Sequence, residues 1–377
     1  MITVKEVITK KDWKAFATFP IKLYKDNPYY VPSFIADEMT ISDEKKNPPA
    51  KGCKVKAFLA YKGDRLVGRI AGIIVNESNR VYNENAIRFS RFDFVEDIEV
   101  AKALLDAVKQ FGKENGMNRL HGPWGFNDTD REGMLTYGFD KHGSYATYYN
   151  YPYYPEFMDK LGYKEESVWI EQKITFPKQG DALFNKYLKL SDFIKRKYKI
   201  REVAGTLPIK EIVKRYGDKF FDCYNAAYKD LDLFVDITGD AKKAVLEQFT
   251  LIINPRYLSI LVDENDQVVA FMVLLPAIGK TIKKHNGKLN LFSIIDLLKT
   301  IKKPDAVELT LAAVRPEYKS LGFTAACIGR IVKNVVEDGI TDVVSDPTLE
   351  SNTAVRAQWS QAESEVIKRR QTYTIDI

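Results

Sequence analysis

The stretch VRPEYKSLGFTAA, residues 314–326, lies between an apolar run, VELTLAA (307–313), and a run with helical periodicity, CIGRIVKNVVEDG (327–339). It therefore predicts a connection from a β-strand to the start of an α-helix. A basic residue, a glycine and a hydroxyl fall inside it. The free N–H groups and positive dipole of a helix start attract phosphate, and glycine lets a phosphate approach the backbone. The stretch is either a phosphate-binding loop or a plain connection.

Outward from this stretch, the chain contains a long internal repeat. FLAYKGDRLVGRIAGII (58–74) and LSILVDENDQVVAFMVLL (258–275) each read as two strands joined by a tight polar turn. Helical runs end at Gly116 and at Gly339, where glycine is the expected left-handed terminator. These features recur in one order at separations of about 200 residues, which indicates two copies of one unit.

Each copy reads as a mixed α/β unit in which a mixed central sheet is flanked by helices. Asn150 and Asn352 open matching segments that end in a last strand, 168–176 in one copy and 369–377 in the other. Pro177 and Gly180 interrupt the pattern between them. We expect one domain over residues 1–178 and a second over 179–377.

Composition excludes several function classes. The net charge is +6 over 377 residues, too weak a basic excess to predict DNA binding, although it suits an anionic ligand. Three cysteines and three histidines at wide spacing predict neither a disulfide framework nor a metal site. We expect no transmembrane segment and no signal peptide, and hence a cytoplasmic protein. The oligomeric state is left open.

The opening stretch resembles the cofactor loop of the GNAT (GCN5-related N-acetyltransferase) fold. In that family a loop of pattern R/Q-x-x-G-x-G/A follows the fourth strand and binds the pyrophosphate of acyl-CoA through backbone amides. The matching residues here are Lys319, Ser320, Leu321, Gly322, Phe323 and Thr324. Lys319 keeps the positive charge without the guanidinium fork, and Thr324 adds bulk where the family has Gly or Ala. The resemblance implies acyl-CoA as co-substrate and no metal.

Nearly the whole chain resembles bacterial tandem-GNAT proteins, on NPYYVPSFIADE (27–38), RFDFVEDIEVAKALL (91–105), HGPWGFNDTDREGML (121–135) and YNYPYY (149–154). In the first copy, the stretch that corresponds to the cofactor loop has no glycine. Asp93, Glu96, Asp97 and Glu99 surround the helix start instead. Carboxylates there cap a helix and repel pyrophosphate. We therefore expect one cofactor site, in the second copy.

The resemblance also implies catalytic positions. Glu308 lies on the strand before the loop, where the family often places a base, and an exposed structural carboxylate is the alternative. Ala313 and Val314 are expected to bind pantetheine through their backbone, with Asn352 also near the cofactor. At the spacing where the family often has a tyrosine acid, this chain has Trp359, so the role is vacant or passes to Tyr373.

Two aromatic and acidic segments of the first copy suggest an acceptor cleft. The loop at 121–133 offers carboxylates to an amine, and YATYYNYPYY (145–154) offers aromatic walls. The candidate substrate-binding residues are Trp124, Asp128, Asp130, Tyr149, Asn150 and Tyr153. Turn-capping carboxylates and a core of tyrosines between the domains are the alternatives.

Residues 280–303 stand outside the repeat. Leu291, Ile294, Ile295 and Leu298 have the spacing of an amphipathic helix among lysines. This helix is a lid, a membrane-surface helix or a packed surface helix.

Three functions follow. The first is an acyl-CoA-dependent N-acyltransferase that acts on a small amine or a peptide. The second keeps the fold and takes its donor from aminoacyl-tRNA, as in transferases of the Fem type. The third is a non-catalytic acyl-CoA- or ligand-binding protein.

Overall fold

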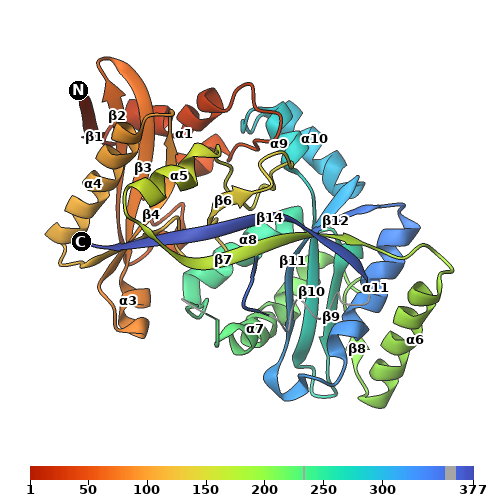
Figure 1. Cartoon of the computed structure of the whole chain (residues 1–377). Helices are drawn as coiled ribbons and strands as arrows, with labels where there is room; N and C mark the ends of the chain where they lie inside the picture. The colour runs from red at the N-terminus through yellow and green to blue at the C-terminus, as the bar shows by residue number, and fades with distance from the viewer. Residues whose placement is uncertain (232–233, 353–361) are drawn as a thin grey trace.

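The computed structural model describes residues 1–231, 234–352 and 362–377. The chain forms two lobes, one for each half, which are joined by two long strands that cross the middle of the molecule (Figure 1). Among the described residues, no helix is long and apolar enough to span a bilayer.

The elements of the first half end with the long strand β7. They are β1 (Ile2–Glu6), α1 (Lys10–Leu23), α2 (Ile35–Glu38), β2 (Cys53–Lys62), β3 (Arg65–Val75), α3 (Asn76–Tyr82), β4 (Ala86–Phe94), α4 (Ile98–Glu114), β5 (Arg119–Gly122), β6 (Met134–Tyr137), α5 (Tyr153–Lys160) and β7 (Lys164–Thr175).

The elements of the second half end with the long strand β14. They are α6 (Ala182–Lys197), β8 (Arg201–Glu202), α7 (Ile209–Tyr228), α8 (Gly239–Ile252), β9 (Leu258–Val262), β10 (Val268–Pro276), α9 (Gly279–Lys284), α10 (Leu291–Lys302), β11 (Ala306–Val314), α11 (Phe323–Glu337), β12 (Asp342–Ser345), β13 (Thr348–Leu349) and β14 (Glu363–Asp376).

The predicted mixed α/β architecture is confirmed. The first predicted hairpin is β2–β3 and the second is β9–β10, both antiparallel. Each half then has a third strand, a helix and a parallel strand, β4–α4–β5 and β11–α11–β12. Gly116 and Gly339 lie just past α4 and α11 with φ of 75° and 69°. The repeat read from the sequence is therefore a repeat of elements.

The two halves share one sheet because they exchange their last strands. The order is β1-β2-β3-β4-β5-β14-β7-β12-β11-β10-β9-β8. The end of β14 pairs with β5 of the first half, from Tyr373 opposite Gly122 to Asp376 opposite Arg119. The end of β7 pairs with β12 of the second half, Ile174 opposite Val343. Each half thus supplies the strand that continues the sheet of the other.

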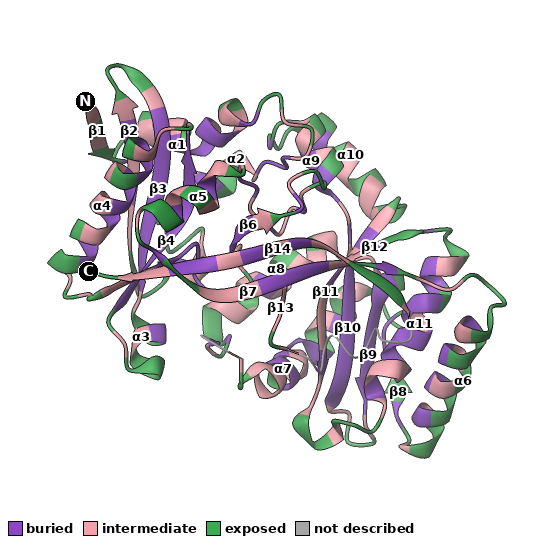
Figure 2. Ribbon diagram, viewed as in Figure 1, coloured by how far each residue is buried: buried purple, intermediate pink, exposed green. Residues whose placement is uncertain are grey.

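Helices cover both faces of the sheet in the second half. One apolar core lies between the sheet and α6 and α11, and contains Ile194, Phe323 and Ile331. The other lies between the sheet and α7 and α8, and contains Phe221, Val273 and Ala313. Of the strands between these layers, β9 and β10 are almost wholly buried, whereas β11 is only partly buried (Figure 2). This layering decides which side chains of β11 face which helices.

Candidate functional site

The candidate site lies on β11, where this strand loses its neighbour. β11 runs parallel to β12 only from Ala306 to Leu309, opposite Asp342–Ser345. From 310 to 314, no strand of the described residues pairs with β11 on that side. Backbone groups at an unpaired strand edge are free to bind an extended ligand. Ala313 and Val314, predicted to bind pantetheine, lie on this segment.

A β-bulge places Glu308 and two later residues on one face of the sheet. The register of β10 against β11 shifts between Val273 and Leu274, opposite the segment that contains Thr310. Val307 and Leu309 belong to the core under α11, while Ala313 belongs to the core under α7. Since side chains alternate along a strand, Glu308 faces the α7–α8 side. The bulge keeps Leu311 and Ala313 on that same side.

The predicted cofactor loop connects β11 to α11 in a tight conformation. Ser320 has φ of 65° and Gly322, the residue before α11, has φ of 87°. A Cβ atom on Gly322 would lie 2.6 Å from Cδ1 of Ile194, so the position requires glycine. Phe323 is buried between Tyr198 and Tyr318, with ring centroids 5.4 and 4.9 Å away. These contacts hold the start of α11 in place.

The start of α11 keeps its N–H groups available. No side chain caps the helix, and its first turn contains no acidic residue. The start of α4 in the first half is different, because Asp97 caps it by accepting from the Glu99 amide at 3.1 Å. Asp93, at the end of β4, binds Arg69 at 2.7 Å, and Arg69 also binds Glu38 at 2.7 Å. The start of α11 therefore offers free N–H groups and a positive dipole to a phosphate, whereas carboxylates surround the start of α4 and repel one.

A row of charged side chains crosses the sheet beside Glu308. Lys368 on β14 donates to Glu171 on β7 at 2.7 Å, and Arg370 binds the same carboxylate at 2.5 Å. All three are at least 97% buried. Asp346 follows β12, and its amide donates to the Leu309 carbonyl at 2.9 Å. The charge of Asp346 acts on Glu308, and the charge of Glu171 acts on both, so that three carboxyl groups lie in the field of the cations Lys368 and Arg370.

The carboxyl groups of Glu308 and Asp346 hold protons more tightly than usual. Removal of water raises the pKa of Glu308 to about 8, and the nearby charge of Asp346 adds to the rise. Burial and the charge of Glu171 raise the pKa of Asp346 to about 7. Two carboxyl groups this close resist double ionisation, so the pair retains a proton near neutral pH. Such a pair is suited to general acid–base chemistry.

The first half contributes side chains to this region of the second. The Ser144 hydroxyl interacts with Glu308, and the Tyr148 carbonyl accepts from Arg370 at 2.5 Å. Tyr224 of α7 donates to Asp128, whose pKa burial raises to about 6. Among the described residues, Asp128 is the one of the six predicted substrate-binding residues whose side chain forms a hydrogen bond with the second half. The loop at 121–133 therefore meets α7 beside the open edge of β11.

The other predicted substrate-binding residues have partners inside the first half. Trp124 packs on Trp169 with ring centroids 5.1 Å apart, and Asp130 binds Arg91 at 3.2 Å. Asn150 bonds both backbone groups of Leu135, at 2.7 and 2.9 Å. The Tyr149 hydroxyl donates to the Phe139 carbonyl at 3.1 Å, and the Tyr153 hydroxyl donates to the Phe94 carbonyl at 2.6 Å. Tyr149 and Tyr153 therefore pack inside the first lobe and not in a core between the domains.

Tyr373 does not lie with Glu308. It is fully buried in the core of the first half, opposite Gly122 and Glu165, and two strands, β7 and β12, lie between its strand and β11. The strand exchange places Tyr373 there, away from the position that an acid in the reaction would need.

Asn352 follows β13, and its backbone N–H donates to the Leu349 carbonyl at 2.9 Å. Trp359 lies outside the described residues.

The sequence analysis missed Asp346, Glu171, Lys368 and Arg370. One signal was present, since Lys368, Arg370 and Thr372 alternate along the last strand and all three are buried. Charged residues at period two in a terminal strand indicate a buried polar face. Their partners were not predictable, because β14 was assigned to the sheet of its own half.

Solved structures share this fold. The chain aligns over its full length with a tandem GNAT protein from the clavulanic acid biosynthesis pathway, at a TM-score of 0.53, 10% identity and 98% coverage of that chain. A GCN5-related N-acetyltransferase from Sphaerobacter thermophilus aligns at a TM-score of 0.52, 9% identity and 95% coverage. The chain therefore has the fold of tandem GNAT proteins.

Two curated proteins resemble the sequence itself. Protein YghO from Escherichia coli is 25% identical over 98% of this chain and 94% of its own length. The bacterial ceramide synthase of Caulobacter vibrioides is 22% identical over 85% of this chain and 82% of its own length. No family model matches the chain.

Proposed function

We propose that this protein is an acyl-CoA-dependent N-acyltransferase with one reaction centre, on β11 of the second half. The observation that carries the proposal is the placement of Glu308, with its raised pKa, on the strand that leads into the uncapped start of α11. Glu308 thus lies just before the unpaired segment 310–314 of β11, and the uncapped helix start lies just after the loop that follows this segment. Acyl transfer from acyl-CoA requires this pair of features.

Residues 319–324 would hold the pyrophosphate, and the backbone of Ala313 and Val314 would bind the pantetheine arm. The Tyr228 hydroxyl donates to the Ala312 carbonyl at 3.3 Å, which keeps α7 against this segment of β11. Lys319 would add a positive charge beside the phosphates. The first half is not expected to bind acyl-CoA, because Asp97 caps α4 and carboxylates surround that helix start.

In the proposed reaction, the amine nitrogen attacks the thioester carbon, the C–S bond breaks and CoA leaves as a thiol. Glu308 accepts the proton that the amine loses. The departing CoA thiolate then takes up this proton, which restores the Glu308 carboxylate and gives the amide and the CoA thiol as products. Its raised pKa makes Glu308 a stronger base than an ordinary carboxylate. Asp346 supports that pKa, and Arg370 and Lys368 keep Glu171 ionised between them.

Amide formation is also the chemistry that the name of one relative implies. A ceramide is the amide of a fatty acid with a long-chain amino alcohol, and the Caulobacter relative is named for making it. Its alignment spans most of both chains. We extend the bond type to this protein and propose a primary amine as acceptor, with the reaction in the cytoplasm, where acyl-CoA is made.

Release of free CoA thiol from acyl-CoA in the presence of an amine panel tests the proposal. Glu308→Gln should reduce turnover by about 100-fold or more while acyl-CoA still binds, because it removes only the base. Glu363→Gln, on the exposed end of β14, is the matched control and should leave turnover unchanged. Normal turnover in Glu308→Gln would eliminate Glu308 as base. Binding of charged tRNA in place of acyl-CoA would favour the aminoacyl-tRNA alternative.

A further inference from the structure

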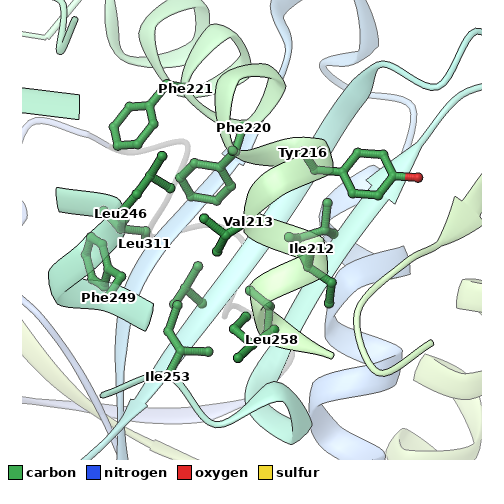
Figure 3. A pocket seen from close by; sticks show the side chains of 14 residues that line it. Ile212, Val213, Tyr216, Phe220, Phe221, Leu246, Phe249, Ile253, Leu258 and Leu311 are labelled. Carbon is green, nitrogen blue, oxygen red and sulfur yellow. The ribbon is translucent and has the colours of Figure 1, made fainter. Parts of the chain in front are cut away.

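An apolar cavity lies between the sheet and helices α7 and α8, on the face that carries Glu308 (Figure 3). Its internal volume is about 40 Å³. Val213 and Phe220 of α7, Leu246 of α8, Ile253 and Leu311 are among its lining residues.

The wall of this cavity presents no hydrogen-bonding side chain to a water molecule. Of the residues that line it, only Tyr216 has a polar side-chain atom, and its hydroxyl points away to donate to Asp266 at 2.9 Å. A buried water needs two or more polar partners, so an occupant of this cavity must be apolar.

The cavity begins beside the proposed reaction centre. Leu258, Val273 and Leu311 form one row across β9, β10 and β11 and belong to its floor. Leu311 follows Glu308 by three residues, or roughly 10 Å along the strand. A chain that starts near the thioester can therefore enter the cavity without crossing the sheet.

We propose that the cavity binds the alkyl chain of a lipid substrate, either the acyl chain of the donor or the chain of an aliphatic amine. The proposal rests on the proposed function, because it assumes that the reaction centre is on β11. Buried methylene groups bind an apolar cavity in proportion to their number, so affinity should rise with chain length until the cavity is full.

Calorimetric titration with acetyl-, octanoyl-, dodecanoyl- and hexadecanoyl-CoA tests the proposal, alongside octylamine and dodecylamine. Each methylene that enters should tighten binding by up to about fourfold. Val213→Phe, which fills the cavity from α7, should abolish the gain while acetyl-CoA binds as before. Lys214→Phe adds the same ring on the exposed side of α7 and should keep the gain.

The outcomes separate the two sources of the chain and the two proposals. A gain in the acyl-CoA series alone assigns the cavity to the donor, and a gain in the amine series alone assigns it to the acceptor. Affinity independent of chain length in both series overturns the cavity proposal and leaves acetyl-CoA binding intact. Amine binding that is sensitive to Val213→Phe, without binding of any acyl-CoA, refutes the proposed function and keeps the cavity.

A second inference comes from α10, independently of the cavity. Leu291, Phe292 and Leu298 expose 69%, 75% and 59% of their surface, and Leu289, Ile294 and Ile295 are also exposed. The four apolar positions predicted from spacing therefore face solvent, while other residues of α10 pack it against the protein. An exposed apolar patch of this size on a well-formed helix indicates a binding surface.

The helix itself is firmly attached. Asn290 and Ser293 form a capping box at its start. Its inner side chains, Leu297 and Ile301, pack against Ile278 and Ile282. Figure 1 shows α9 and α10 together at the periphery of the molecule. The exposed stripe is thus presented outward by a rigid support.

Lysines surround the stripe. Lys288, Lys299, Lys302 and Lys303 are exposed, and no acidic partner is recorded for them among the described residues. Asp296 of α10 is already bound by Lys284 at 2.6 Å and by His285 at 2.9 Å. A twofold contact between two copies of this patch would bring like charges together. An anionic bilayer satisfies both the apolar stripe and the lysines.

We infer that α10 docks the protein on an anionic membrane surface, with its apolar stripe at the level of the lipid headgroups. The end of α8 connects this surface to the cavity. Ile252 packs with Leu297 and Ile301 of α10, and the next residue, Ile253, lines the cavity. A lipid substrate in the membrane would then lie close to both α10 and the cavity.

Co-sedimentation with phosphatidylcholine vesicles, with and without phosphatidylglycerol, tests this inference. The full-length chain should bind the anionic vesicles, and the double variant Phe292→Ser, Leu298→Ser should bind roughly tenfold more weakly. Lys299→Glu with Lys303→Glu should remove the preference for phosphatidylglycerol. Ile8→Ser, an equally exposed position on the first lobe, is the control. Absence of vesicle binding, or a dimer that the Phe292 and Leu298 substitutions dissociate, would overturn the inference.

Discussion

Glu308 and Asp346 lie where one proton is shared between two carboxyl groups. Two fixed cations, Lys368 and Arg370, are already occupied by Glu171. The remaining pair therefore has no counterion that fully offsets a second charge. In the proposed reaction, function and stability oppose each other at this pair, since the reaction uses the ionised form of Glu308 and the surroundings disfavour that form.

Glu308→Gln should raise the melting temperature at pH 8.5 by a few degrees and leave it unchanged near pH 4. The folded pKa of Glu308 is raised above its unfolded value, so the unfolded chain loses this proton first as pH rises. Stability is then lost between the unfolded pKa and about pH 8. Calorimetry at the two pH values measures the difference. Equal melting temperatures of the wild type and Glu308→Gln at pH 8.5 would show that ionisation of Glu308 does not lower the free energy of unfolding.

Asp346→Asn should move the acidic limb of the pH–rate profile of kcat/KM to lower pH. The negative charge of Asp346 raises the pKa of Glu308, and asparagine removes that charge. Glu308 would then ionise more readily and act as a weaker base. A limb that does not move would indicate that Glu308 does not set it.

The sequence predicted Glu308 from its strand and loop, but not its partners. Asp346 directly follows a short strand, and nothing in the sequence around it distinguishes it from a turn residue. Lys368 and Arg370 belong to a strand whose neighbours depend on the exchange between halves. Side chains from β14, β7, β12 and β11 meet only through pairing across the whole chain, and local patterns carry no information on such pairing.

At the scale of elements, the loop between β11 and α11 depends on one backbone conformation. Gly322 has φ of 87° and contacts Ile194 closely. The hairpins and helix ends were predictable because turn residues and glycine terminators signal them locally. The outward direction of the α10 stripe was not, since the same spacing serves a helix that packs inward or outward.

Gly322→Ala should destabilise the protein by about 1–2 kcal/mol and weaken acyl-CoA binding, because alanine disfavours this φ and meets Ile194. Ile194→Val removes the Cδ1 atom that the new methyl would meet. The double variant should therefore recover part of the loss, and a double-mutant cycle from denaturant unfolding measures that coupling. Strictly additive effects would show that the contact with Ile194 is unimportant.

At the scale of the molecule, the exchange of β7 and β14 makes the two halves interdependent. Each sheet continues through a strand from the other half. The domain boundary at residue 178 remains a prediction, and the exchange means that a cut there leaves both pieces with an unmatched strand.

Residues 1–178 and 179–377, produced separately, should each fail to unfold cooperatively, and should associate when produced together. An unpaired sheet edge at β5 or β12 is prone to non-specific pairing in the isolated pieces. Circular dichroism of each piece and co-purification of the pair are the measurements. Cooperative unfolding of either piece alone would show that its own last strand can replace the exchanged one.

We propose that each chain binds one acyl-CoA, at the start of α11. Calorimetry of dodecanoyl-CoA with Thr324→Glu and Thr324→Gln tests it most directly, since glutamate in the first turn favours the helix dipole and repels pyrophosphate. We expect one site per chain in the wild type, binding weakened about tenfold or more in Thr324→Glu, and little change in Thr324→Gln, at equal melting temperatures. Two sites per chain, or equal affinity of the three proteins, would contradict the claim.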